Sequence, residues 1–208
     1  SLHLAREVQQ NLLPKSNLKV NGFDIAGKSV YCDETGGDYY DFISIKYNDK
    51  QKFGVAIGDV SGHGISSALL MATVRSSLRQ RASLPGSIAD IISDVNRQLV
   101  QDVEDSGQFM TMFFMVLTAE SKQLEWVRAG HDPAIIYDPV SDSFNELSGS
   151  GIALGVDGGW NFEENKKVDL SKGQIIFLST DGVWEVRNKK GEMLGKEPIL
   201  NTIRQNSS

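Results

Sequence analysis

Two consecutive segments in the first half of the chain, 65–82 and 87–103, have apolar residues at the spacing of an amphipathic helix. Ser87 stands at the start of the second segment, where its hydroxyl can accept a backbone hydrogen bond and cap the helix. The pattern therefore predicts two long helices that each bury one face.

The remaining apolar residues gather in short runs separated by polar and turn residues, as in β-strands. The predicted strands are 22–31, 38–47, 52–59, 109–118, 123–130, 133–138 and 174–180. The letters NDK at 48–50 indicate a hairpin turn between the second and third of them. Strands, then two helices, then further strands indicate an α+β fold with antiparallel sheets rather than βαβ units.

The first residues carry a shorter apolar stripe made of Leu4, Val8 and Leu12, and Pro14 ends the helix that this stripe predicts. A lone short helix needs a surface to cover. That surface is either the rest of this domain or the same stripe on a second chain, which would make a homodimer through the N-terminal helix.

Composition limits the function classes. The 208 residues are 40% hydrophobic and 23% charged, with a net charge of −6 and no basic block, which argues against nucleic-acid binding. The longest apolar runs, such as 110–117, are too short to span a bilayer, and the single cysteine, Cys32, fits a reducing compartment. We expect a cytoplasmic protein with no membrane segment within this chain.

Three aspartates share one setting, the flank of a strand next to glycine: Asp38 in TGGDYYDF, Asp59 in IGDVSGHG and Asp181 in LSTDGVWE. A carboxylate beside a residue without a side chain leaves room for a small cation and its waters, and hard divalent cations prefer oxygen ligands. Two ions that share an aspartate could activate water and stabilise an in-line attack on phosphorus. Each Asp-Gly pair alone is also a common turn.

The combination is more specific than its parts. The stretches LLP…GFDIAGKSVYCDETGGDYYDF, GDVSGHGISSALLMA, RAGHDPAIIYD, GIALGV and LSTDGVWEVRN occur in that order from about residue 9 onward. Together they resemble the SpoIIE-like, RsbU-type branch of the metal-dependent (PPM, type 2C) protein serine/threonine phosphatases. The resemblance implies an α-β-β-α sandwich, in which two antiparallel sheets lie between helices.

The same resemblance implies catalytic and metal-ligating roles where residues match. Asp59 matches the aspartate that bridges two Mn²⁺ or Mg²⁺ ions, and Val60 stands where the family supplies a backbone carbonyl to one ion. Asp38 matches the acidic ligand on the adjacent strand, and Asp181 matches an acidic ligand of the other ion.

Two further residues are weaker candidates. Asp41 lies three residues beyond Asp38, and an odd offset along a strand points it to the opposite face. Gly182 follows Asp181 and leaves space beside that carboxylate.

The chain departs from the family pattern in two places. Classical relatives have a phosphate-gripping arginine where this chain reads DETGG, so phosphate binding is expected to depend on the metals. The family also has a last strand with a paired-aspartate motif, and no such motif occurs in these residues. We expect a linker or regulatory helix at 1–14 and a phosphatase domain at 15–208 that lacks the last strand within this sequence. That strand either lies outside these residues or is missing, and in the second case one metal would bind weakly.

The resemblance implies a protein serine/threonine phosphatase whose substrate is a small phosphorylated anti-anti-sigma-type (STAS) protein in bacterial partner-switching. The N-terminal helix would connect the domain to an upstream sensory or receiver domain.

Three alternatives remain open. One is a nucleotide cyclase, because GGDYYDF is similar to the GGDEF signature, although Tyr39 and Tyr40 replace the expected residues. Another is a catalytically weak or inactive member of the fold that acts as a binding module. A P-loop enzyme is the third, and no Gly-Lys-Ser/Thr follows the glycines. Among the histidines, His63 and His131 are expected to form hydrogen bonds in turns rather than to act in catalysis.

Overall fold

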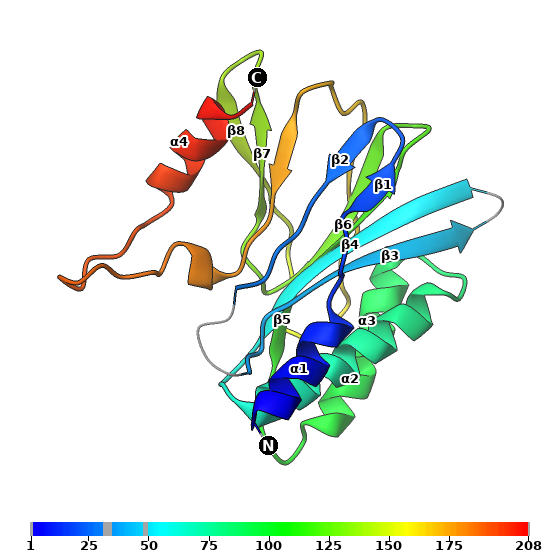
Figure 1. Cartoon of the computed structure of the whole chain (residues 1–208). Helices are drawn as coiled ribbons and strands as arrows, with labels where there is room; N and C mark the ends of the chain where they lie inside the picture. The colour runs from blue at the N-terminus through cyan, green and yellow to red at the C-terminus, as the bar shows by residue number, and fades with distance from the viewer. Residues whose placement is uncertain (1, 31–34, 48–49, 208) are drawn as a thin grey trace.

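The computed structural model describes residues 2–30, 35–47 and 50–207 (Figure 1). The helices are α1 (Leu2–Leu12), α2 (Ile65–Ala82), α3 (Ile88–Asp102) and α4 (Glu197–Gln205), with one short 3-10 helix, η1 (Asp181–Val183). The strands are β1 (Leu18–Val20), β2 (Phe23–Ile25), β3 (Tyr39–Tyr47), β4 (Lys50–Val60), β5 (Met110–Thr118), β6 (Gln123–Ala129), β7 (Ala134–Asp138), β8 (Ser143–Leu147), β9 (Asn165–Lys167) and β10 (Ile175–Phe177). Along the described part of the chain, no helix is both long and apolar enough to cross a membrane.

The larger sheet has five strands in the order β3-β4-β5-β6-β9, and neighbouring strands are antiparallel. Its central strand β5 is apolar on both faces because both faces are covered. Met112, Phe114 and Val116 join the core on the helix side, whereas Phe113 and Met115 join a second core on the other side. This alternation explains why the run MTMFFMVL reads as continuously apolar.

The smaller sheet has three antiparallel strands in the order β10-β7-β8 and supplies the other wall of the second core. Ala134 and Ile136 of β7 and Leu147 of β8 lie in that core with the residues of β5 and β6. Two antiparallel sheets therefore pack face to face, which confirms the predicted sandwich.

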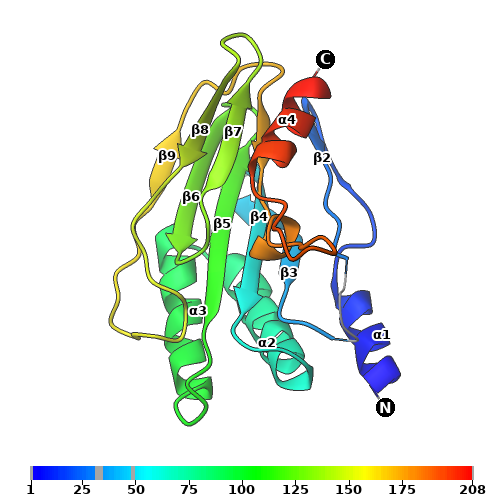
Figure 2. The ribbon, with the colours of Figure 1, turned by 90° about the vertical axis from the view of Figure 1, so that its left-hand side faces the viewer.

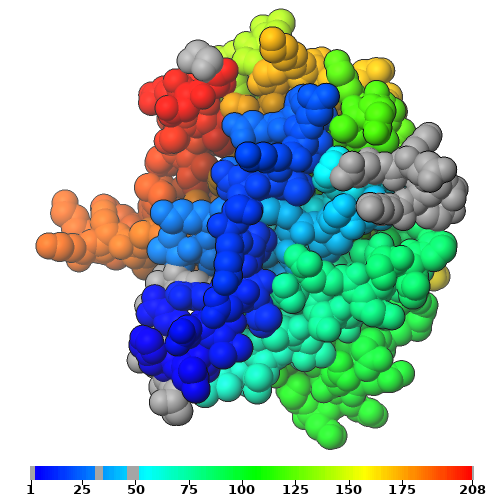
Figure 3. All heavy atoms as spheres, turned by 45° about the vertical axis from the view of Figure 1, so that its right-hand side comes forward, coloured from blue at the N-terminus to red at the C-terminus, as the bar shows by residue number. Residues whose placement is uncertain are grey.

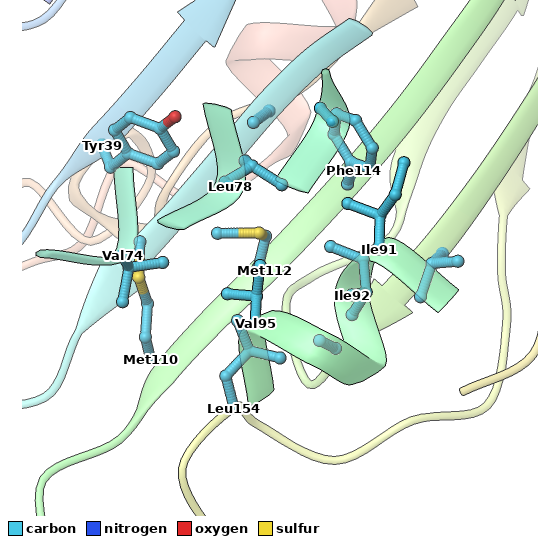
Figure 4. Packing of buried hydrophobic residues seen from close by; sticks show 14 of the residues in the cluster. Tyr39, Val74, Leu78, Ile91, Ile92, Val95, Met110, Met112, Phe114 and Leu154 are labelled. Atoms are coloured by element: carbon cyan, nitrogen blue, oxygen red, sulfur yellow. The ribbon is translucent and has the colours of Figure 1, made fainter. Parts of the chain in front are cut away.

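Helices α2 and α3 lie side by side on the outer face of the larger sheet (Figure 2). Figure 4 shows their side chains, among them Leu78 and Ile92, directed at Met112 and Phe114 of β5. Ser87 caps α3 as predicted. Its hydroxyl accepts from the Asp90 backbone N–H at 3.0 Å, and the Asp90 carboxylate accepts from the Ser87 N–H at 2.9 Å, which completes a capping box.

Beside the smaller sheet, the described residues form the short helix α4. Arg204 of α4 donates to Asp142 at 2.6 Å, and its guanidinium lies 5.1 Å from the ring centroid of Phe144. The elements α4, β8 and β9 were not predicted from the sequence. The two strands are short and largely polar, whereas α4 has Ile199, Leu200 and Ile203 at helical spacing, a signal that was missed.

The predicted strand at 22–31 is wrong in extent. Within the described part of this range, 22–30, only Phe23–Ile25 forms a strand, and it pairs with β1, which the sequence did not predict. Gly27 instead lies against a ring, because a Cβ there would be 2.6 Å from Cε2 of Tyr40. The predicted NDK turn falls partly, and Cys32 entirely, outside the described residues.

Asp41 is fully buried where β3 faces α2. Its carboxylate accepts from Arg79 Nε at 2.6 Å and from the Tyr39 hydroxyl at 3.0 Å, and Arg75 Nε lies 3.7 Å away. Asp94 also pairs with two arginines, Arg81 and Arg97, but its side chain is 37% exposed.

This contrast gives a prediction. Asp41→Ala leaves two arginines and a buried hydroxyl without their acceptor, so we expect a loss of about 3 kcal/mol in the free energy of unfolding. The matched surface change Asp94→Ala is expected to cost less than about 1 kcal/mol. Urea unfolding of both variants checks this, and equal losses would contradict the role given to Asp41.

Candidate functional site

Asp59 is placed by the register of β4 and β5, in which it lies opposite Thr111. It follows Val55 and Ile57 along one face of β4, the face that packs toward the smaller sheet. Gly58 is needed next to it, because a Cβ there would lie 2.4 Å from the Thr111 carbonyl oxygen. Asp59 therefore stands at the end of the space between the two sheets.

The loop that carries Asp38 packs directly against Asp59. A Cβ on Gly37 would lie 2.5 Å from the Val60 carbonyl oxygen and 2.9 Å from Oδ1 of Asp59. The Val60 N–H also donates to the Gly37 carbonyl at 3.3 Å. Gly37, the second glycine of TGGD, thus lets two chain segments approach closely enough to bring Asp38, Asp59 and the Val60 carbonyl together.

Asp181 is carried by the smaller sheet, because it is the first residue of η1, shortly after strand β10. The backbone N–H groups of Trp184 and Glu185 donate to its carbonyl at 3.0 and 2.9 Å, which fixes the turn. Thr180 hydrogen-bonds to the Asp38 side chain. A Cβ on Gly182 would have Thr180 Oγ1 as its nearest neighbour, at 3.9 Å, so this glycine leaves open space next to Asp181.

The three carboxylates interact electrostatically. Burial, then the charges of Asp38 and Asp181, raise the pKa of Asp59 to about 6. Burial also raises the pKa of Asp38, against a lowering by its hydrogen bond to Thr180, and the Asp181 charge raises it further. Repulsion among partly buried carboxylates is relieved by a bound cation or by protonation.

These residues fit divalent cations that keep part of their water. Within the described ranges, no three His, Cys, Asp or Glu side chains close around a single point, so the site is not a compact cage. Mg²⁺ and similar ions are commonly held by one or two carboxylates, carbonyl oxygens and waters. The donor set of Asp38, Asp59, Asp181 and the Val60 carbonyl, with the space made by Gly37, has that character.

Asp41 is placed elsewhere, in the buried network with Arg79 described above. It points to the helix-facing side of β3, as its odd offset from Asp38 predicts. Its carboxylate is already matched by arginines, and the structure does not bring it to the other three aspartates.

Sequence reasoning missed Gln9. This side chain of α1 is only 3% exposed and forms hydrogen bonds with both the N–H and the carbonyl of Gly36. Its Nε2 donates to the Gly36 carbonyl at 2.6 Å, and its Oε1 accepts from the Gly36 N–H at 3.3 Å. The N-terminal helix is therefore tied to the loop of Asp38. The amphipathic pattern around Val8 indicated that this helix has a buried side. It did not indicate the binding partner of Gln9, which lies 27 residues away in the sequence.

His63 and His131, the two histidines expected in turns, differ in exposure. His63 is exposed in the turn before α2. His131 is 5% exposed in the turn between β6 and β7 and forms hydrogen bonds there, in agreement with its predicted structural role. Burial lowers the pKa of His131, which keeps its ring neutral near pH 7.

Known proteins share this sequence pattern and fold. Residues 49–208 match the family model described as Stage II sporulation protein E (SpoIIE). The phosphoserine phosphatase RsbU of Bacillus subtilis is 30% identical over 190 residues, covering 91% of this chain and 55% of RsbU. The chain thus spans little more than half of that relative.

Two solved structures share the fold. The SiaA-PP2C domain of Pseudomonas aeruginosa superposes with a TM-score of 0.73 at 21% identity, covering 98% of this chain and 80% of that one. The RsbU and RsbW domains of Rv1364c from Mycobacterium tuberculosis give a TM-score of 0.70 at 23% identity, covering 86% and 48%. The family match extends over most of the chain and includes Asp59 and Asp181, and it shows that this chain belongs to the SpoIIE family.

Proposed function

We propose that this domain is a Mn²⁺- or Mg²⁺-dependent protein phosphatase that removes phosphate from serine or threonine. The observation that carries the proposal is the meeting of Asp38, Asp59 and Asp181 where the two sheets end, with the pKa of Asp59 raised to about 6 by burial and its acidic neighbours. Phosphoryl transfer needs charge neutralisation at such a site, and bound cations provide it.

Each residue has a distinct task in this proposal. Asp59 would contact both ions, the Val60 carbonyl and Asp38 would hold one of them, and Asp181 would hold the other. When bound, the ions would supply an activated water for attack on phosphorus and would neutralise the phosphate oxygens. The Thr180 side chain lowers the pKa of Asp38 by hydrogen bonding and would thereby favour the ionised carboxylate that a cation needs.

For the substrate, we propose a phosphorylated STAS-type regulator in bacterial partner-switching, handled in the cytoplasm. The name of the relative RsbU, a phosphoserine phosphatase, supports phosphoserine as the residue whose phosphate ester is hydrolysed. Because that relative is much longer than this chain, we also propose that an upstream sensory or receiver domain precedes α1 in the whole protein. The cyclase alternative loses support, since the strand pairs of both sheets are antiparallel.

For α1, we propose a role in regulation through a second copy of the chain. Leu4 and Val8 are 63% and 55% exposed, although the helix docks on its own domain through Gln9 and the neighbouring Leu13. In Figure 3, α1 lies at the surface beside α2. A second α1 that pairs with this free stripe would form a parallel dimer and could act on the Asp38 loop through Gln9.

The activity prediction uses para-nitrophenyl phosphate. Wild-type protein should turn it over with Mn²⁺ and lose activity in EDTA, and Asp59→Asn should lose at least about 100-fold because both ions lose a ligand. Asp181→Asn should instead raise the Mn²⁺ concentration that gives half-maximal rate. Asp102→Asn, on the exposed side of α3, is the control. Activity of the wild type in EDTA would contradict the metal mechanism.

The pH prediction concerns metal-free protein. The folded pKa of Asp59, about 6, lies above its unfolded value, so ionisation destabilises the fold as pH rises from about 4 to 6. Asp59→Asn removes this effect. Because Asp59 is partly exposed, solvent screening reduces the gain, and we expect about 1 kcal/mol, or roughly 2–4 °C in Tm, at pH 7.5 in EDTA.

The difference between variant and wild type should shrink toward pH 4.5, where Asp59 is already largely protonated in the folded state, and vanish below about pH 4, where the unfolded state is protonated as well. Added Mn²⁺ should raise the Tm of the wild type and leave that of Asp59→Asn nearly unchanged. Thermal melts at both pH values measure this, and a variant less stable than wild type at pH 7.5 in EDTA would speak against the repulsion.

The dimer prediction compares two glutamates on α1. Val8→Glu places a charge on the exposed stripe and should halve the mass measured by light scattering. Gln10→Glu adds the same charge at an exposed position off the stripe and should leave the mass unchanged. A wild-type protein that stays monomeric at high concentration, or equal effects of both changes, would rule out this interface.

A further inference from the structure

His131 lies where the chain leaves the larger sheet and enters the smaller one. It is in the four-residue connection between β6 and β7, and its side chain is 5% exposed. Gly130 before it has a φ of +69°, and a Cβ there would be 2.7 Å from the backbone N of Ala153. The Arg128 guanidinium donates to the His131 carbonyl and, at 3.0 Å, to the Gly149 carbonyl. The backbone of His131 is therefore held in place independently of its ring.

Both ring nitrogens of His131 have partners. Nε2 lies 3.2 Å from the Ser179 carbonyl oxygen, and Nδ1 lies 2.9 Å from the Thr111 hydroxyl. A carbonyl oxygen only accepts hydrogen bonds, so Nε2 must carry the proton. In the neutral ring Nδ1 then accepts from Thr111. Each nitrogen is used in one defined sense, which fixes both the tautomer and the orientation of the ring.

The two partners belong to opposite sides of the candidate site. Thr111 is paired with Asp59 in the β4–β5 register, and its hydroxyl lies 3.5 Å from the Asp59 carbonyl oxygen. Ser179 lies two residues before Asp181 and next to Thr180, which hydrogen-bonds to Asp38. One imidazole thus links the strand opposite Asp59 to the segment that carries Asp181.

We propose that His131 is a positioning residue that fixes the distance between Asp59 and Asp181 across the two sheets. This rests on the proposed function, because the two carboxylates must serve one pair of ions. Asp59 is held by the register of the larger sheet, whereas Asp181 begins a short 3-10 helix just beyond an edge strand. Without the donor at Nε2, the Ser179–Asp181 segment can shift, and the ion that depends on Asp181 binds less tightly.

The test separates the two ring nitrogens. In His131→Gln the side-chain amide can reach the place of Nε2 and still donate to the Ser179 carbonyl. In His131→Asn the shorter amide reaches only the place of Nδ1 and keeps the contact to Thr111. His131→Ala removes both contacts. The control is Asn96→Ala, because Asn96 is also a buried polar residue that holds a distant loop, with 2.7 and 2.9 Å bonds to Asp157 and Gly155, away from the three aspartates.

Two quantities are measured on the full-length protein with each change: the Mn²⁺ concentration for half-maximal turnover of para-nitrophenyl phosphate, and the dissociation constant of Mn²⁺ from electron paramagnetic resonance. We expect both to rise about 10-fold in His131→Asn and His131→Ala, as for other groups that orient metal ligands, and to stay within about 3-fold of wild type in His131→Gln. Asn96→Ala should lower the Tm without changing either Mn²⁺ titration.

Equal Mn²⁺ titrations for His131→Asn and His131→Gln would overturn the proposal, even if His131→Ala fails to fold. A wild-type protein without Mn²⁺-dependent turnover would count against the proposed function instead. If wild type is active and the changes at His131 lower only the Tm, the residue stabilises the fold and does not position Asp181.

Discussion

The antiparallel register between β4 and β5 is the constraint on which the rest of this structure depends. β5 is covered on both faces, by α2 and α3 on one side and by the smaller sheet on the other, so a one-residue slip would exchange its two cores. The same register brings Asp59 opposite Thr111 at the end of the space between the sheets. The position of the central carboxylate is thus fixed by the packing of the most buried part of the molecule.

The aspartates of the site and of the core show two solutions to buried negative charge. Asp41 is fully buried and is matched by arginines from α2. Asp38, Asp59 and Asp181 lie near one another, and burial, together with repulsion from the other two, raises the pKa of Asp59 to about 6. Such unmatched charge is unfavourable for the metal-free fold, and it is also what makes the place attractive to a cation.

Much of the fold could be predicted from the sequence, because burial leaves a periodic trace. The helix 65–82 has the predicted bounds, and Ser87 caps the next helix. The short strands β8 and β9 leave little such trace. Helix α4 has apolar residues at helical spacing but buries none of them fully, and it is held by contacts distant in sequence, such as that of Arg204 with Asp142. The three site aspartates were identified from their glycines and a family resemblance. Gln9 and Thr111 were not, since their importance comes from partners that only the folded chain brings near.

The clamp between Gln9 and Gly36 has a consequence for the two adjacent glycines of TGGD. Gln9 binds the peptide groups of residue 36, and a Cβ at Gly36 would meet nothing within 4 Å. A Cβ at Gly37 would run into the Val60 carbonyl oxygen at 2.5 Å. An alanine can therefore replace Gly36 without breaking the hydrogen bonds to α1, whereas any side chain at Gly37 would clash. Two adjacent glycines thus differ in the substitutions that the fold tolerates.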